Sequence, residues 1–199
     1  MKISLSIIAF FVAGILIGSR GWIPNFSTSG LSAYVLYGLM FLVGVGMGMD
    51  KKSFSLLIKS SWKVFLVPLT VIVGSLIGSV VVVAFISQIS YLNAMSVGAG
   101  FGYYSLSSIM IGAVRGEELG TIALLANLFR EIFTLLLAPV LVWGFGKLAP
   151  IVSGGATSMD TTLPVITHFS GKEYAAISIL SGTVLTLLVP IIESLLLAL

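Results

Sequence analysis

The segment from Gly154 to Pro164 contains the residues with the clearest potential for chemistry. It reads Gly-Gly-Ala-Thr-Ser-Met-Asp-Thr-Thr-Leu-Pro, so the carboxylate of Asp160 stands among hydroxyl side chains that include Thr157, Ser158 and Thr161. Such a segment offers a charge, side-chain oxygens and free backbone carbonyls, which suit an ammonium group, a sodium ion or a proton. Alternatively, Asp160 caps a helix, since Asp before Thr-Thr-Leu-Pro also suits a helix start.

A second polar group interrupts a long apolar run. Asn127, Arg130 and Glu131 stand at positions i, i+3 and i+4, so on a helix Asn127 lies beside either charge while the two adjacent charges diverge by about 100°. An isolated charge at membrane depth is costly, so both charges need partners. In a functional interpretation Arg130 holds a substrate carboxylate, whereas in a structural one the group locks this helix to its neighbours.

Glycine and aromatic residues combine in a third group, formed by Gly100, Gly102, Tyr103, Tyr104 and Ser105. Glycine lets the backbone approach a ligand closely, and the face of an aromatic ring can hold a cation. The group is therefore a candidate binding wall. The alternative is helix packing together with an aromatic belt at the membrane interface.

The composition predicts a protein that spans a membrane. Of 199 residues, 58% are apolar or aromatic and only 9% are charged, against roughly 25% charged in a soluble domain. The chain has one histidine and no cysteine, so we expect no metal site, no cofactor and no disulfide. It also lacks a recognisable nucleophile with its base, so we do not expect an enzyme. Basic residues cluster in one short loop, which indicates membrane topology rather than nucleic-acid binding.

Helices must position these groups, because apolar runs of about 20 residues can cross a bilayer. Apolar runs predict membrane helices over residues 3–19, 30–49, 64–86, 119–145 and 174–199, of which 119–145 is the one that contains Asn127, Arg130 and Glu131. Two further runs, 94–114 and 150–169, are interrupted by glycine, hydroxyl residues or proline, and each interior glycine costs a helix roughly 1 kcal/mol. We therefore expect one all-α transmembrane transporter domain over residues 1–199. It would have about five to seven crossings and two broken or re-entrant segments, near 96–111 and 152–168.

The distribution of basic residues predicts the topology. The basic loop at residues 51–63 belongs in the cytoplasm by the positive-inside rule, which also places the N-terminus there. The count of basic residues favours two broken segments that behave alike, either both crossing or both re-entrant. His168, near the end of the second segment, and Glu193, near the end of the chain, are expected at the membrane interface.

The two interrupted segments resemble each other. Gly98-Ala99 recurs as Gly155-Ala156 at an offset of 57 residues, which also relates two leucines and two isoleucines. Residues 64–114 and 121–171 are therefore a possible internal repeat, although chance similarity in a biased composition is the alternative. Two interrupted hydrophobic segments in corresponding positions are typical of a transporter's binding site.

Four motifs occur in a fixed order along the chain, and the likeness that they carry covers nearly all of it. They are Phe41-Leu-Val-Gly-Val, Gly100-Phe-Gly-Tyr-Tyr-Ser-Leu-Ser, Asn127-Leu-Phe-Arg-Glu131 and Gly155-Ala-Thr-Ser-Met-Asp-Thr-Thr-Leu-Pro164. In these motifs the chain resembles the LysO-type lysine exporter family of bacteria and archaea. Longer members resemble it only in their C-terminal part and carry a further N-terminal membrane region. The resemblance therefore implies that a small membrane partner subunit, or a homo-oligomer, supplies the remaining helices.

The resemblance implies a secondary transporter in the cytoplasmic membrane of a prokaryote that exports L-lysine and toxic analogues in exchange for protons. Asp160 would then bind the lysine side-chain ammonium or the exchanged proton in alternation, while Arg130 and unwound backbone amides take the carboxylate. Two alternatives remain open. One is a cation/proton antiporter or a carrier of another amino acid or polyamine with the same architecture, and the other is a non-transporting subunit of a membrane complex.

Overall fold

The structure, a computed structural model, describes residues 62–85 and 88–199, together with Leu16, Tyr34, Gly38, Phe41 and Val45. The chain divides into two units, Met1–Val35 and Leu36–Leu199, and all elements described below belong to the second. The predicted helices at 3–19 and 30–49, and the lysines at positions 51, 52 and 59, lie outside the described residues. The described residues form helices and no β-strand, which confirms the predicted all-α class.

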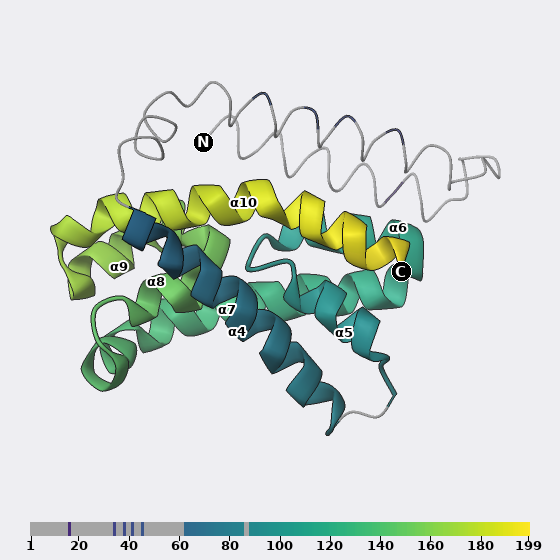
Figure 1. Cartoon of the computed structure of the whole chain (residues 1–199), viewed down its shortest axis with the longest axis horizontal. Coiled ribbons are helices and arrows are strands. Elements are labelled where there is room, and N and C mark those ends of the chain that lie inside the picture. Colours follow the sequence, from purple (N-terminus) through teal and green to yellow (C-terminus); the bar gives the residue numbers. More distant parts are fainter. Residues whose placement is uncertain are drawn as a thin grey trace. The chain divides into compact units, whose positions relative to one another are not determined.

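Three long helices form the frame of the described region (Figure 1). A 3-10 turn, η1 (Trp62–Phe65), leads into α4 (Leu66–Val83), which is followed later by α7 (Glu117–Phe145) and, after the turn η3 (Lys172–Tyr174), by α10 (Ala175–Ala198). Each is long and apolar enough to cross a membrane. They confirm the helices predicted at 64–86, 119–145 and 174–199. The prediction of five to seven crossings in total stays a prediction.

The first broken segment consists of two short helices separated by an irregular stretch. Helix α5 (Tyr91–Gly98) is capped by Ser90, whose hydroxyl accepts a hydrogen bond from Asn93 N, and five residues separate its end from the start of α6 (Tyr104–Arg115). Between them Phe101 has φ 47° and Gly102 has φ 100°. Because glycine adopts a positive φ without steric penalty, Gly102 allows the chain to turn at this point.

The second broken segment has the same plan. Helix α8 (Ala149–Gly154) passes into a 3-10 turn, η2 (Gly155–Met159), and α9 (Leu163–Ser170) follows. Gly155 has φ 61°, and a Cβ atom there would overlap the carbonyl oxygen of Phe101 in the first segment. Both predicted interruptions, near 96–111 and 152–168, are thereby confirmed as breaks in helices.

The two breaks meet in the core of the described region. Ala156 N donates a hydrogen bond of 2.8 Å to Phe101 O, and both residues belong to the main buried cluster, which α10 completes with Leu185 and Val189. Helix α10 approaches η2 closely, because a Cβ on Gly182 would lie 2.7 Å from Ala156 O. The glycines of the breaks and of α10 therefore allow backbone to pack on backbone where the two segments meet.

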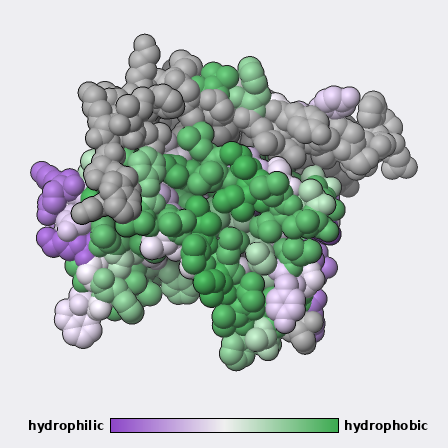
Figure 2. All heavy atoms as spheres, viewed as in Figure 1, coloured by the Kyte–Doolittle hydropathy of each residue, from purple (hydrophilic) through white to green (hydrophobic). Residues whose placement is uncertain are grey.

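The outward faces of the long helices are apolar. Large hydrophobic side chains with substantial exposure include Leu69, Val73 and Ile77 on α4 and Phe129, Phe133, Leu136, Val140 and Trp143 on α7. Figure 2 shows hydrophobic residues over the middle of one face and hydrophilic residues gathered toward its edges. Contiguous exposed apolar surface of this kind is unfavourable in water but is satisfied by lipid tails.

Candidate functional site

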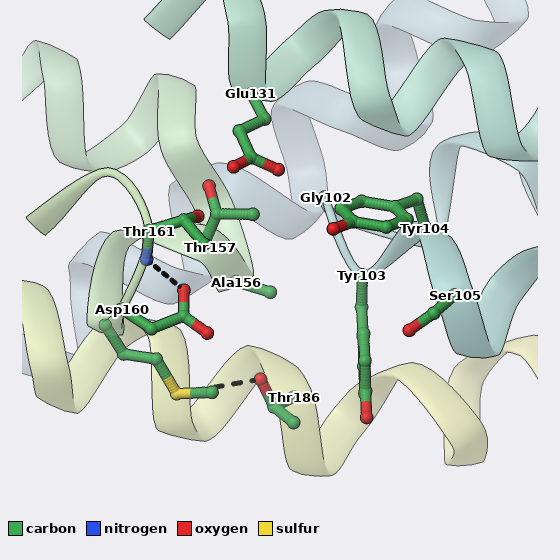
Figure 3. A pocket seen from close by; sticks show the side chains of 11 residues that line it. Gly102, Tyr103, Tyr104, Ser105, Glu131, Ala156, Thr157, Asp160, Thr161 and Thr186 are labelled. Atoms are coloured by element: carbon green, nitrogen blue, oxygen red, sulfur yellow. Dashed lines mark hydrogen bonds between the residues drawn. The ribbon is translucent and has the colours of Figure 1, made fainter. Parts of the chain in front are cut away.

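A cavity of about 340 Å³ lies beside the point where the two breaks meet (Figure 3). This volume falls within the range of roughly 300–1,000 Å³ that is usual for small-molecule sites. Residues of both breaks and of the first turn of α6 form its wall, together with one residue each from α7 and α10. The lining residues are Gly102, Tyr103, Tyr104, Ser105, Glu131, Ala156, Thr157, Met159, Asp160, Thr161 and Thr186.

Two carboxyl groups face this cavity from different elements. Glu131 reaches in from α7; it is 9% exposed, and its Oε2 atom has no hydrogen-bond partner in the described part of the chain. Asp160 is exposed at the lip of the cavity, where Oδ1 accepts a 2.6 Å hydrogen bond from Thr161 N. No lysine, arginine or histidine is among the described lining residues. The described lining is therefore acidic and suits a cationic ligand.

Asp160 does not cap helix α9. The N-cap position of that helix is Thr162, and no side chain caps it. Asp160 instead follows η2 directly and turns its carboxylate toward its neighbour's amide. The arrangement leaves the second carboxylate oxygen of Asp160 available at the cavity lip.

The aromatic group forms the wall opposite Asp160. Figure 3 shows the rings of Tyr103 and Tyr104 on one side of the cavity and Asp160 on the other, with Glu131 between them at the top of the view. Both tyrosines are half-buried, and Ser105 beside them is exposed. A cation between these walls would contact a carboxylate and an aromatic ring at once, which are the two groups that attract it most directly.

Arg130 points away from this cavity. Its Nε donates to Ser153 O at 2.7 Å, Nη2 donates to Val152 O at 3.0 Å and Nη1 donates to Ser75 Oγ at 2.8 Å. Ser153 and Val152 belong to the last turn of α8, whose carbonyl groups carry partial negative charge. The guanidinium group thus caps α8, and the predicted divergence of Arg130 and Glu131 is confirmed. The structure does not bring Arg130 together with Asp160.

Asn127 plays the corresponding part at the first break. Its Oδ1 accepts from Gly102 N at 2.8 Å, and its Nδ2 donates to Val97 O at 3.2 Å and to Ala123 O at 2.9 Å. Gly100 lies against it, because a Cβ there would be 2.5 Å from Asn127 Nδ2. Asn127 and Gly100 therefore shape the irregular stretch that presents Gly102 and the tyrosines to the cavity.

Ser158 is buried behind the second break. Its hydroxyl donates to Gly155 O and to Ser178 O, and the Ser178 hydroxyl donates back to Ser158 O at 2.7 Å. These bonds join η2 to α10.

The residues singled out from the sequence fall into two groups. Those that line the cavity are Gly102, Tyr103, Tyr104, Ser105, Glu131, Thr157, Asp160 and Thr161. Those that hold its walls are Gly100, Asn127, Arg130 and Ser158.

Three lining residues were not singled out from the sequence: Ala156, Met159 and Thr186. Thr186 donates to Gly182 O within α10 and contacts the sulfur of Met159 at 3.9 Å. The signal in the sequence is the row of hydroxyl residues in this apolar helix, since Ser178, Ser181, Thr183 and Thr186 are all buried. Hydroxyl groups that recur in a membrane helix indicate the face that meets protein rather than lipid.

Glu193 requires a correction. It was expected at the membrane interface, but its side chain is fully buried, and within the described part of the chain neither carboxyl oxygen has a hydrogen-bond partner. The distance from the chain end suggested an interface, whereas packing decides burial. Glu193 continues the buried stripe of Leu185 and Val189 at helical spacing.

Comparison with known proteins places the chain among transport proteins. Residues 8–197 match the family described as lysine exporter LysO. The chain is 35% identical over 192 residues to a protein named lysine exporter LysO from Escherichia coli (strain K12). The aligned region covers 95% of this chain and 62% of that protein. It is 32% identical over 185 residues to a putative lysine exporter from Haemophilus influenzae (strain Rd), with 91% of each covered. No solved structure matches the chain.

Proposed function

Since the chain belongs to the lysine exporter LysO family, we propose that it exports L-lysine and toxic lysine analogues in exchange for protons. The observation that carries the proposal is the cavity at the crossing of two broken helices, which two carboxyl groups line without any described basic residue. Long apolar helices and the family assignment make the chain a multi-pass membrane protein. We place it in the cytoplasmic membrane of a prokaryote with its N-terminus in the cytoplasm.

Lysine presents two ammonium groups and one carboxylate, and the cavity offers matching groups. Asp160 and Glu131 take the ammonium groups, and the rings of Tyr103 and Tyr104 contact the cationic end. The lysine carboxylate meets the first turn of α6, where no side chain caps the helix at Tyr103. The free N–H groups and the partial positive charge of this helix end favour an anion. This assignment replaces the expected contact between Arg130 and the carboxylate.

Arg130 acts in this scheme as a positioning residue. Three of its five N–H groups are occupied by Ser75, Val152 and Ser153, so binding a carboxylate would require some of these bonds to break. Its positive charge offsets the partial negative charge of the carbonyl groups at the end of α8. This contact keeps the following turn, η2, in place, and η2 includes Met159 in the cavity wall. Asn127 is likewise a positioning residue, because its hydrogen bonds hold the first break in place.

Competition between lysine and a proton supplies the coupling. A protonated Asp160 is neutral and attracts ammonium less strongly than the ionised form. Because Asp160 is exposed at the lip of the cavity, a proton can reach it when lysine leaves. Binding of one ligand therefore weakens binding of the other, which is the condition for exchange.

We further propose that residues 64–114 and 121–171 are two copies of one structural unit. The offset of 57 residues carries α4 onto part of α7, α5 onto α8, and α6 onto α9. Each unit thus has a long helix, a short helix, a break and a second short helix. Paired units around a shared site are the usual basis of alternating access in secondary transporters.

Efflux from proteoliposomes tests the proposed function. The purified chain is reconstituted, preloaded with labelled lysine and given an inward proton gradient; we expect the gradient to accelerate lysine efflux. Unlabelled ornithine, arginine, putrescine and sodium are added in turn to identify competing ligands. No lysine efflux from correctly folded chain would contradict a self-sufficient exporter. Recovery of efflux on co-reconstitution with a membrane partner would place the missing activity in a complex.

A further inference from the structure

Glu193 is the one acidic residue in the described part of the chain that is completely buried. It lies on the membrane-spanning helix α10, on the face that packs against α6. The two helices run beside each other near the C-terminal end of α10 (Figure 1). Neither of its carboxyl oxygens has a hydrogen-bond partner among the residues that the structure describes. An ionised carboxylate without a partner is highly unfavourable in such a place, so the group must hold a proton or a cation.

A second unpartnered polar group adjoins it. Ser107 on α6 is fully buried beside the Glu193 carboxyl, and its hydroxyl has no hydrogen-bond partner among the described residues. A hydroxyl can accept a hydrogen bond from a protonated carboxyl or donate one to a carboxylate. Leu106, next to Ser107 in sequence, and Val189, one turn before Glu193, belong to the main buried apolar cluster.

The charged and titratable groups on the elements packed against α10 do not neutralise Glu193. On α6, Arg115 donates instead to Leu197 O at 3.4 Å, one turn further along α10. Asp160, which follows η2, lines the cavity together with Thr186. Thr186 precedes Glu193 by seven residues of α10, which is roughly 10 Å along the helix. Tyr104 of α6 lines the cavity. Helices α5 and α9 contribute Tyr91 and His168, both exposed, and α4 contains no titratable residue. The turn η3, with Lys172, Glu173 and Tyr174, directly precedes α10 and therefore lies at the opposite end of that helix from Glu193.

The pair also adjoins the first break. A Cβ on Gly100 would lie 2.7 Å from Ser107 Oγ and 2.5 Å from Asn127 Nδ2. Gly100 is therefore wedged between the residue that faces Glu193 and the residue that holds the break. A movement of this break would therefore change the surroundings of the Glu193 carboxyl. Conversely, ionisation of that carboxyl would disfavour the packing of α6 against α10 that the structure shows.

We propose that Glu193 and Ser107 form a second proton-binding site, separate from the cavity of Asp160 and Glu131. In this proposal the Glu193 carboxyl is protonated while α6 packs on α10, and the Ser107 hydroxyl is the group placed to accept its hydrogen bond. The proton leaves when the first break moves and water reaches the carboxyl, and a proton returns on closure. The role of this site in coupling rests on the proposed exchange of lysine for protons, whereas proton binding itself does not.

Infrared spectroscopy of the purified chain in lipid nanodiscs at neutral pH tests proton binding directly. A protonated carboxyl gives a C=O stretching band that a carboxylate lacks, and we expect Glu193→Gln to remove such a band. Ser107→Ala should shift this band to the higher frequency of a carboxyl without a hydrogen bond. Ser108→Ala, one position along α6, is the matched control and should leave it unchanged, because the Ser108 hydroxyl bonds to Ser105 O within its own helix.

Several outcomes would overturn the proposal. If Glu193→Gln leaves the carboxyl region of the spectrum unchanged, Glu193 holds no proton. If sodium removes the band, the site binds a metal cation instead. If Glu193→Gln does not fold, the Ser107→Ala spectrum tests the proposal instead. A carboxyl band at the same frequency in Ser107→Ala and the unmodified chain would contradict a hydrogen bond between Glu193 and Ser107.

Transport measurements then test coupling. In proteoliposomes, we expect Glu193→Gln to lose the acceleration of lysine efflux by an inward proton gradient, while Ser108→Ala retains it. Full acceleration in Glu193→Gln would overturn the coupling role. Absence of lysine transport by the unmodified chain, together with a band that Glu193→Gln removes, would contradict the proposed function and leave the proton site standing.

Discussion

The two broken segments share a plan but differ in the groups that hold and surround them. The break between α5 and α6 is held by the neutral amide of Asn127 and presents tyrosine rings to the cavity. The break after α8 is held by the charged guanidinium of Arg130 and presents the Asp160 carboxylate. Both holding residues come from α7, one turn apart.

This difference separates structural charge from ligand-binding charge. Arg130 neutralises the carbonyl end of α8 on one side of α7, while Glu131, the next residue, faces the cavity on another side. Because the guanidinium group of Arg130 is paired with the carbonyl groups of α8, it does not neutralise the two carboxyl groups that face the cavity. A membrane protein can thus hold a broken helix together and still keep an acidic site for a cation.

The largest expected effect concerns the contact between the breaks. Gly155→Ala forces a left-handed φ on a residue with a Cβ and drives that atom into Phe101 O. We expect the free energy of unfolding to fall by about 3 kcal/mol or more. Thermal unfolding in detergent measures this loss. Gly144→Ala is the control, because a Cβ there meets nothing within 4 Å; an equal loss in both variants would contradict the crossing geometry.

The second effect concerns the charge of the cavity. Asp160→Asn removes the carboxylate from the second break while keeping its shape, and we expect proton-driven lysine efflux to fall about 100-fold, as is usual when a charged partner is removed. Efflux from proteoliposomes measures it. Glu173→Gln breaks only the exposed pair with Lys147 and should change efflux little. Full proton-coupled export by Asp160→Asn would refute the assignment.

A smaller effect separates positioning from binding. Arg130→Lys keeps the charge but cannot make the three bonds to Ser75, Val152 and Ser153. We expect a loss of stability of about 2 kcal/mol. Lysine affinity at the cavity, measured by calorimetry on folded protein, should change less than about threefold. Arg115→Lys, which replaces an exposed arginine with a single contact, is the control. A large loss of lysine affinity with normal stability would instead show that Arg130 binds the ligand.

The smallest effect concerns the aromatic wall of the first break. Tyr103→Leu removes the ring face, and we expect the dissociation constant of lysine to rise about fivefold, in line with a cation–π contribution near 1 kcal/mol. Tyr103→Phe retains the face and should bind nearly as the original does. Calorimetric titration with lysine distinguishes the two. Equal affinity in Tyr103→Leu and Tyr103→Phe would assign Tyr103 to packing alone.

The sequence predicted the breaks well because their cause is local. Gly102 and Gly155 adopt positive φ angles, and glycine is the residue that does so without strain. The periodicity of apolar residues likewise located α4, α7 and α10. The divergence of Arg130 and Glu131 followed from helix geometry alone.

The direction in which each charge points was not predictable, because it depends on neighbours distant in sequence. Spacing shows that Arg130 and Glu131 diverge, but only the position of α8 shows which one meets helix carbonyls. Glu193 was misplaced for the same reason. Its burial depends on α6, which lies more than 75 residues earlier in the chain, and nothing in its immediate sequence reports that contact.

The hydrogen bond from Ala156 N to Phe101 O has a mechanical consequence. If either break slides past the other, this bond is lost, and a carbonyl and an amide remain unsatisfied inside a dry core. A rotation that keeps the bond carries no such penalty. The bond therefore defines a pivot, and the two segments are free to rock about it while translation between them is resisted.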